Sequence, residues 1–133
     1  MRGFTITQSD GDHLTIDIYS NPKPLKCFDW IDVKITVKAG GFSGKFDASL
    51  LFQDFIDIHS ELNRLYNNLA GSMKFEALEE QLYIEIFGDG KGHFEAVCKV
   101  RDKAGIGNNL EFILNFDQTF IPAILRDLEQ IIA

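Results

Sequence analysis

The longest helical pattern in the chain runs from Phe55 to Gly71. Hydrophobic side chains recur there at steps of three and four residues, which places them on one side of a helix. This stripe consists of Phe55, Ile58, Leu62, Leu65 and Leu69. The pattern predicts an amphipathic helix that begins near Phe52, and we expect Gly71 to end it in the left-handed conformation that glycine adopts easily.

Alternating hydrophobic and polar segments lie on both sides of this helix and predict β-strands with one buried face. The predicted strands cover residues 4–8, 13–19, 31–38 and 42–51 before the helix, and 72–77, 81–87, 93–101 and 110–116 after it. In the fourth strand the alternation assigns five side chains to the core: Phe42, Gly44, Phe46, Ala48 and Leu50. Pro22 and Pro24 exclude regular strand pairing in the connection 20–28.

A second amphipathic helix is predicted near the end of the chain. We expect Thr119 to be its N-cap, so that Pro122 is the third helical residue, where a missing N–H leaves no helical hydrogen bond unmade. Its hydrophobic stripe consists of Ile121, Ile124, Leu125, Leu128, Ile131 and Ile132.

The two halves of the chain resemble each other. HLTIDIYS at 13–20 matches QLYIEIFG at 81–88, and hydrophobic positions 46, 48, 50, 58, 62 and 65 recur 66 residues later. This predicts an internal duplication of a ββββα unit, with pseudo-repeats 1–71 and 72–133 in a single domain 1–133. Any run of strands followed by a helix could produce some of this similarity, so both interpretations stay open. Neither half can bury its sheet face alone, so we expect one shared core.

These elements predict an α+β fold, with mostly antiparallel sheet and two helices on one side. The net charge of −7, from 20 acids and 13 bases, argues against nucleic acid as a ligand and favours either solubility alone or capture of a basic partner. No hydrophobic run is long enough to cross a membrane, and the first residues have no signal-peptide pattern, which predicts a cytoplasmic protein. Cys27 and Cys98 are far apart and form no CxxC pair, so two free thiols are expected.

The candidate chemical motifs are weak. The segment 88–93, GDGKGH, lacks the spacing of a phosphate-binding loop and is flanked by strands, which predicts a hairpin turn. Asp10, Asp12 and His13, or Asp89 with His93, do not have the spacing of a metal site. We therefore predict no catalytic residues, no metal, no cofactor and no enzyme activity, although a pairing of a cysteine with a histidine stays open.

Two surface features favour protein binding. Tyr83, Phe87, Val97 and Ile113 are expected on the sheet face that points away from the helices, where they suggest a covering layer, a homodimer or a partner. Trp30 lies beside Asp29 and Asp32, and tryptophan is common at the centres of interfaces. Packing inside the monomer is the alternative for both features.

The chain resembles the WapI family of bacterial immunity proteins. The resemblance spans residues 29 to 131, and its strongest pieces are GDGKGH at 88–93 and FDQTFIP at 116–122. Shorter pieces are DWI at 29–31, GFSG at 41–44, LAG at 69–71 and GNNL at 107–110. These are turn and cap sequences, and the resemblance supplies no catalytic residues.

The resemblance implies a cytosolic protein that binds and neutralises a cognate toxin domain, often a nuclease. The predicted contact residues are exposed acids, aromatics and one aliphatic: Asp29, Trp30, Asp32, Tyr83, Glu85, Phe87 and Ile113. The alternative function is a non-enzymatic binding or scaffold domain that dimerises through its apolar sheet face.

Overall fold

The computed structural model describes residues 2–20 and 26–133, and its elements follow one another as two successive ββββα units. The first unit comprises β1 (Arg2–Thr7), β2 (His13–Ser20), β3 (Trp30–Ala39), β4 (Phe42–Leu51) and α1 (Phe52–Asn68). The second comprises β5 (Ala70–Glu76), β6 (Leu82–Asp89), β7 (His93–Arg101), β8 (Asn109–Asp117), the 3-10 turn η1 (Gln118–Phe120) and α2 (Ile121–Ile132). The predicted α+β class and the ββββα repeat are confirmed.

Each unit forms one antiparallel sheet whose strands lie in chain order, β1-β2-β3-β4 and β5-β6-β7-β8. All eight predicted strands are present, with bounds that agree to within two residues. The two prolines of the predicted irregular connection, Pro22 and Pro24, lie outside the described residues.

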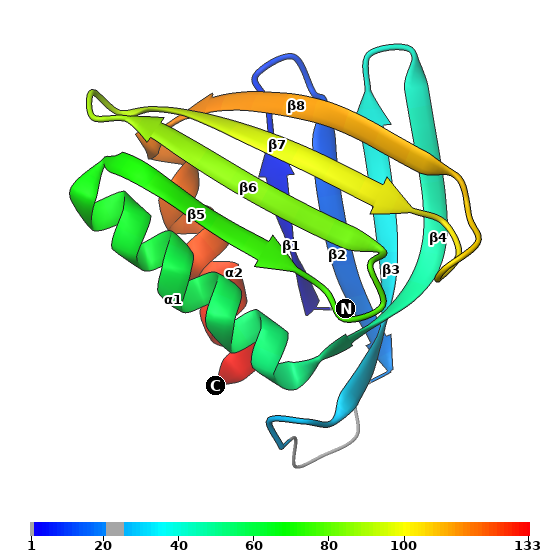
Figure 1. The fold of residues 1–133 in the computed structure, drawn as a ribbon. Coiled ribbons are helices and arrows are strands. Elements are labelled where there is room, and N and C mark those ends of the chain that lie inside the picture. Colours follow the sequence, from blue (N-terminus) through cyan, green and yellow to red (C-terminus); the bar gives the residue numbers. More distant parts are fainter. Residues whose placement is uncertain (1, 21–25) are drawn as a thin grey trace.

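The two sheets cross, and both helices lie together on one side of the molecule (Figure 1). Helix α1 packs along β5 and helix α2 packs along β1, while the two helices contact each other. Each helix therefore covers the edge strand of the unit to which it does not belong. This exchange gives the two units the single shared hydrophobic core that the sequence predicts.

The alternation places most core side chains correctly, because the inward positions of β2, β3, β6 and β7 are buried. The prediction for β4 is wrong in its first half. Ala48 and Leu50 are buried, but Phe42 is 67% exposed, Gly44 is exposed and Phe46 is half-buried. The reason is that β4 is an edge strand and that its first half faces a groove where the second sheet leaves space.

The end of α1 also differs from the prediction. Leu69, with φ of 63°, is the left-handed C-cap, and its N–H donates to the Leu65 carbonyl at 2.8 Å. Gly71 lies inside β5 instead, with φ of 102°. At the other end, the buried Asp54 carboxylate accepts a hydrogen bond from the Leu51 N–H at 2.9 Å, and burial raises the pKa of Asp54.

The predicted N-cap of the last helix is wrong. The N-cap of α2 is Phe120, which makes no side-chain cap hydrogen bond. Asp117 caps the preceding turn η1, and its carboxylate accepts hydrogen bonds from the N–H and the hydroxyl of Thr119. Pro122 lies in the first turn of α2, where an N–H has no helical acceptor. None of the described helices is long and apolar enough to cross a membrane.

Both cysteines are free thiols, as predicted, and their environments are opposite. Cys27 is exposed, whereas Cys98 is buried in β7, where desolvation raises its pKa to about 12. The thiolate is the nucleophilic form, so Cys98 is protonated and inert at neutral pH.

We expect one thiol per native chain to react with Ellman's reagent at pH 8, because Cys98 is buried and its raised pKa keeps the thiol protonated. Two thiols should react in denaturant, and Cys27→Ser should leave no fast native reaction. Rapid labelling of Cys98 in the folded Cys27→Ser variant would contradict the burial described above.

Candidate partner-binding surfaces

The outer face of the second sheet carries three cross-strand rows of side chains. The pairing registers of β5 to β8 define these rows as Ser72, Phe87, Glu95 and Asn115; Lys74, Glu85, Val97 and Ile113; and Glu76, Tyr83, Lys99 and Glu111. Four of these side chains are acidic and two are basic. We call this surface the second-sheet face.

Phe87 and Ile113 are the hydrophobic side chains of the second-sheet face that are most open to solvent, at 41% and 50% exposed. Tyr83 is held by its neighbours, since its hydroxyl donates to Glu85 at 2.7 Å and the Lys99 ammonium lies 5.1 Å from its ring centre. The hydrogen bond to Glu85 also raises the pKa of Tyr83. Phe87 and Ile113 are therefore more available to a partner than Tyr83 is.

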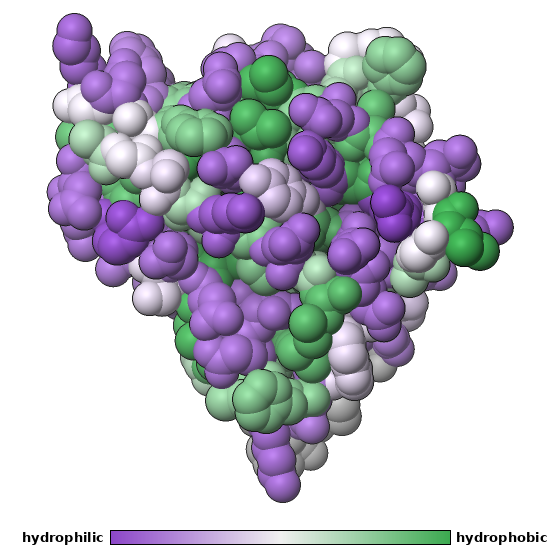
Figure 2. Space-filling view, viewed as in Figure 1, coloured by the Kyte–Doolittle hydropathy of each residue, from purple (hydrophilic) through white to green (hydrophobic). Residues whose placement is uncertain are grey.

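The hydrophobic side chains on this side of the molecule lie in small patches between hydrophilic ones (Figure 2). A shallow depression of about 300 Å³ lies beside Phe87 and is also lined by Asp89, His93, Glu95 and Asn115. An aromatic ring next to two carboxylates suits a cationic side chain, which can stack on the ring while its charge is neutralised.

The predicted hairpin at Gly88–His93 connects β6 to β7 at one end of this face. Asp89 holds the turn, because its carboxylate accepts hydrogen bonds from the N–H groups of Lys91 at 2.7 Å and His93 at 3.1 Å. These hydrogen bonds lower the pKa of Asp89. Across residues 2–20 and 26–133, no group of three or more His, Cys, Asp or Glu is placed to hold a metal ion.

The second predicted set lies elsewhere, at the start of β3 in the first sheet. Trp30 is 48% exposed, but Asp29 already has a local role, since its carboxylate accepts from the Lys26 N–H at 2.7 Å. Asp32 accepts from the Ser49 hydroxyl at 3.3 Å. The two predicted sets belong to different sheets, and the structure does not bring them together. The set near the start of β3 is Asp29, Trp30 and Asp32, and the set on the second-sheet face is Tyr83, Glu85, Phe87 and Ile113.

A depression of about 190 Å³ near Asp32 adds acids that the sequence did not connect with it. Its lining includes Asp32, Asp47 and Glu79, which come from β3, β4 and the β5–β6 connection. Asp47 is paired with Lys34. Only the crossing of the two sheets brings these segments together, so no local sequence signal could have identified the cluster.

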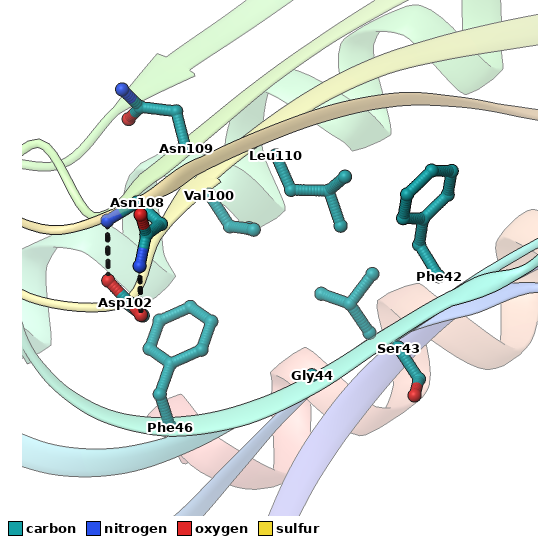
Figure 3. A pocket seen from close by; sticks show the side chains of 10 residues that line it. Phe42, Ser43, Gly44, Phe46, Val100, Asp102, Asn108, Asn109 and Leu110 are labelled. Atoms are coloured by element: carbon teal, nitrogen blue, oxygen red, sulfur yellow. Dashed lines mark hydrogen bonds between the residues drawn. The ribbon is translucent and has the colours of Figure 1, made fainter.

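A third feature is a groove of about 240 Å³ between the edge strands β4 and β8 (Figure 3). Its lining includes equivalent positions of the two units, 66 residues apart: Phe42 with Asn108, Ser43 with Asn109, and Gly44 with Leu110. The groove therefore lies between matching parts of the duplicated fold. Asp102 closes one end, where its carboxylate accepts from the Asn108 N–H at 2.7 Å.

Among the described residues, neither cysteine makes a hydrogen bond to a histidine, and the Cys98 thiol faces the Ala96 carbonyl at 3.9 Å. His59 joins the two helices, with its Nε2 3.0 Å from a carboxylate oxygen of Glu129 in α2. It is off the hydrophobic stripe of α1, as predicted, but it is half-buried by this contact.

Comparisons with known proteins bear on the family and the fold of the chain. Residues 5–133 match the family model described as "Immunity protein WapI-like family". No curated protein matches the chain significantly. Among solved structures, the fold is similar to a chain in the crystal structures of Trypanosoma bruciei MRP1/MRP2, with a TM-score of 0.52 and 10% identity over 98% of this chain and 84% of that one. At this identity the likeness concerns the fold alone.

Acid should weaken the turns of the protein. The pKa values of Asp89, Asp102 and Asp117 are lowered by hydrogen bonds to their carboxylates, so their stabilisation is present above the unfolded pKa near 3.9 and is lost as pH falls through the folded values. We expect the midpoint of urea unfolding to fall between pH 5 and pH 3. Asp102→Asn should reduce this slope, whereas Glu95→Gln, which removes a carboxylate outside the turns, should preserve it.

Proposed function

The chain belongs to the immunity protein WapI-like family, and on this premise we propose that it binds a cognate toxin domain and blocks the active site of that toxin. Binding requires no catalytic group in the immunity protein. It requires a surface that matches the toxin and holds it long enough to exclude the substrate.

The second-sheet face is the surface that we propose for this contact. Phe87 and Ile113 supply exposed hydrophobic area, and Glu85 and Glu95 lie in the same rows of the sheet. A toxin that acts on nucleic acid must present basic groups to the phosphates. An acidic face with hydrophobic anchors would cover such a site, and its charge would accelerate the encounter.

The observation that carries the proposal is the combination of exposed hydrophobic anchors and excess acid on one face. The second-sheet face has four glutamates and two lysines. In a homodimer through this face, the glutamates of one copy would lie against those of the other. Like charges at an interface oppose association. A basic partner therefore fits this face better than the scaffold alternative of self-association does.

Trp30 is a second contact point in this proposal, with Asp29 and Asp32 beside it. It lies on the first sheet, so a toxin large enough to wrap around the molecule would be needed to reach both places. We assign the larger part of the binding energy to the second-sheet face, because Asp29 and Asp32 are already engaged by Lys26 and Ser49.

Affinity capture from the native cell, at low salt and at about 0.5 M salt, would supply the partner, which is then identified and purified. We expect Phe87→Ala and Ile113→Ala each to raise the dissociation constant of the purified complex about tenfold or more, because central anchors dominate interfaces. Ile106→Ala is the matched control, since it removes an exposed isoleucine from the β7–β8 connection, outside the rows of the second-sheet face. Equal losses in all three variants, or no rescue of growth by the wild-type protein, would contradict the proposal.

The charge component has a separate kinetic signature. Glu95→Lys should slow association at low salt more than it speeds dissociation, and added salt should reduce the difference from wild type. Asp57→Lys, which makes the same charge change at an exposed position of α1, is the control for net charge. If both variants slow association equally, the local charge of the second-sheet face is not what steers the toxin.

Trp30→Ala tests whether the first sheet takes part. We expect a smaller loss of affinity than for Phe87→Ala, because the two places lie on different sheets. A larger loss would move the principal contact to the start of β3.

A further inference from the structure

The first half of β4 presents unused main-chain hydrogen-bonding groups. A two-residue turn pairs Ala39 with Phe42, and farther along β4 the Asp47 carbonyl points away from β3 and accepts from the Gln81 amide at 3.2 Å. Main-chain groups alternate in direction along a strand, so those of Ser43 and Lys45 point the same way as that of Asp47. Within the described part of the chain, these groups of Ser43 and Lys45 have no partner on that side.

The other strand edges are covered, at least in part. Helix α2 packs along β1 and helix α1 along β5. Gln8 accepts a hydrogen bond from the outward Asn115 N–H of β8 at 2.7 Å, and Gln81 donates one to the Asp47 carbonyl of β4. The stretch Phe42–Lys45 receives no such hydrogen bond and also exposes the Phe42 ring beside the groove. The middle of β8 is open in the same way, but it carries the acid Glu111. An open edge with an exposed aromatic ring is a template for pairing with another strand.

The local charge indicates which partner suits this edge. Residues 33–46 contain Lys34, Lys38 and Lys45 and no acid, although the whole chain carries a charge of −7. Lys34 is paired with Asp47 and Lys38 with Asp12, so acids of neighbouring segments offset most of the local positive charge. A basic toxin therefore finds no excess of acid to attract it here. Two copies of this acidic chain repel each other over most of their surface, but along this stretch they can meet without a large excess of like charge.

We propose that two copies of the chain form a homodimer by antiparallel pairing of their β4 edges, centred on Gly44. In this register Ser43 lies opposite Lys45 of the second copy, and each such pair exchanges both of its N–H···O bonds. The pairing joins the two first sheets into one continuous sheet. It is isologous, because the same stretch serves both copies.

The register also determines which side chains of the two copies lie opposite each other. Phe42 comes to lie opposite Phe46 of the second copy on the inner face, so the aromatic rings cover the hydrophobic side of the groove. Each Lys45 lies opposite a serine, not another lysine. The two glycines meet at the symmetry axis as a pair whose Cα atoms are about 4.5 Å apart. A Cβ at Gly44 would meet nothing within 4 Å in the single chain, so the monomer itself does not require glycine there.

Sedimentation equilibrium over a range of protein concentrations should reveal a reversible dimer. Gly44→Asp should raise its dissociation constant about tenfold or more, because two carboxylates would face each other at the axis. Ala123→Asp is the matched control: it adds the same charge at an exposed position of α2, away from the β4 edge, and should preserve the dimer.

A second pair of variants tests the main chain directly. Lys45→Pro removes an N–H that the monomer does not use and should abolish the dimer while leaving the monomer folded. Glu111→Pro makes the same change at the equivalent position of β8, 66 residues on, and should leave the dimer intact. In a Cys27→Ser background, Gly44→Cys should form an intermolecular disulfide, since its Cα separation lies within the range for disulfides.

Three results would overturn the proposal. The first is a monomer at all concentrations, and the second is a dimer that Gly44→Asp and Lys45→Pro do not weaken. The third is loss of toxin binding, instead of dimerisation, in these β4 variants, which would make the edge a toxin site. Failure of toxin capture by the wild-type protein would leave the dimer test unaffected, because the sedimentation experiment uses this chain alone.

Discussion

The architecture depends on an exchange of helices between the two units. Helix α1 closes the β5 edge of the second sheet, and α2 closes the β1 edge of the first. Phe4 of β1 packs edge-to-face on Phe55 of α1, with ring centres 6.3 Å apart, so the first strand and the first helix meet in the shared core. Each sheet needs the helix of the other unit to bury its apolar face. The hydrophobic core is therefore continuous across the two units.

The same exchange leaves two edges without helices, β4 and β8, and these edges border the groove. Two glutamine side chains form hydrogen bonds with some of the main-chain groups of these edges. Gln81, which is 6% exposed, donates to the carbonyls of Asp47 in β4 and Arg101 in β7 and so ties the two sheets together. The Gln8 side chain likewise accepts a hydrogen bond from the Asn115 N–H of β8. The stretch Phe42–Lys45 of β4, which neither glutamine reaches, is therefore one of the open edges of the fold.

Charge is distributed unevenly over the surface. The second-sheet face has an excess of acid around Phe87 and Ile113, whereas residues 33–46 of the β3–β4 hairpin contain no acid. The proposed toxin site is the first of these regions, and the proposed dimer contact is the second. A dimer through β4 would leave the outer face of the second sheet free, so the two proposed contacts are compatible on one molecule.

Periodicity alone determined the elements of this protein, because a period of 3.6 or of 2 reports which side of each segment is hydrophobic. It located the strands, both helices, the duplication and the outward positions of Phe87 and Ile113. It could not show which strands are edges, so it placed Phe42 and Phe46 in the core. It also placed the caps at Gly71 and Thr119 instead of Leu69 and Phe120, because a cap depends on local backbone conformation that the hydrophobic period does not report. The separation of Trp30 from the second-sheet face depends on how the sheets cross. That crossing is set by packing between distant segments, which no local pattern records.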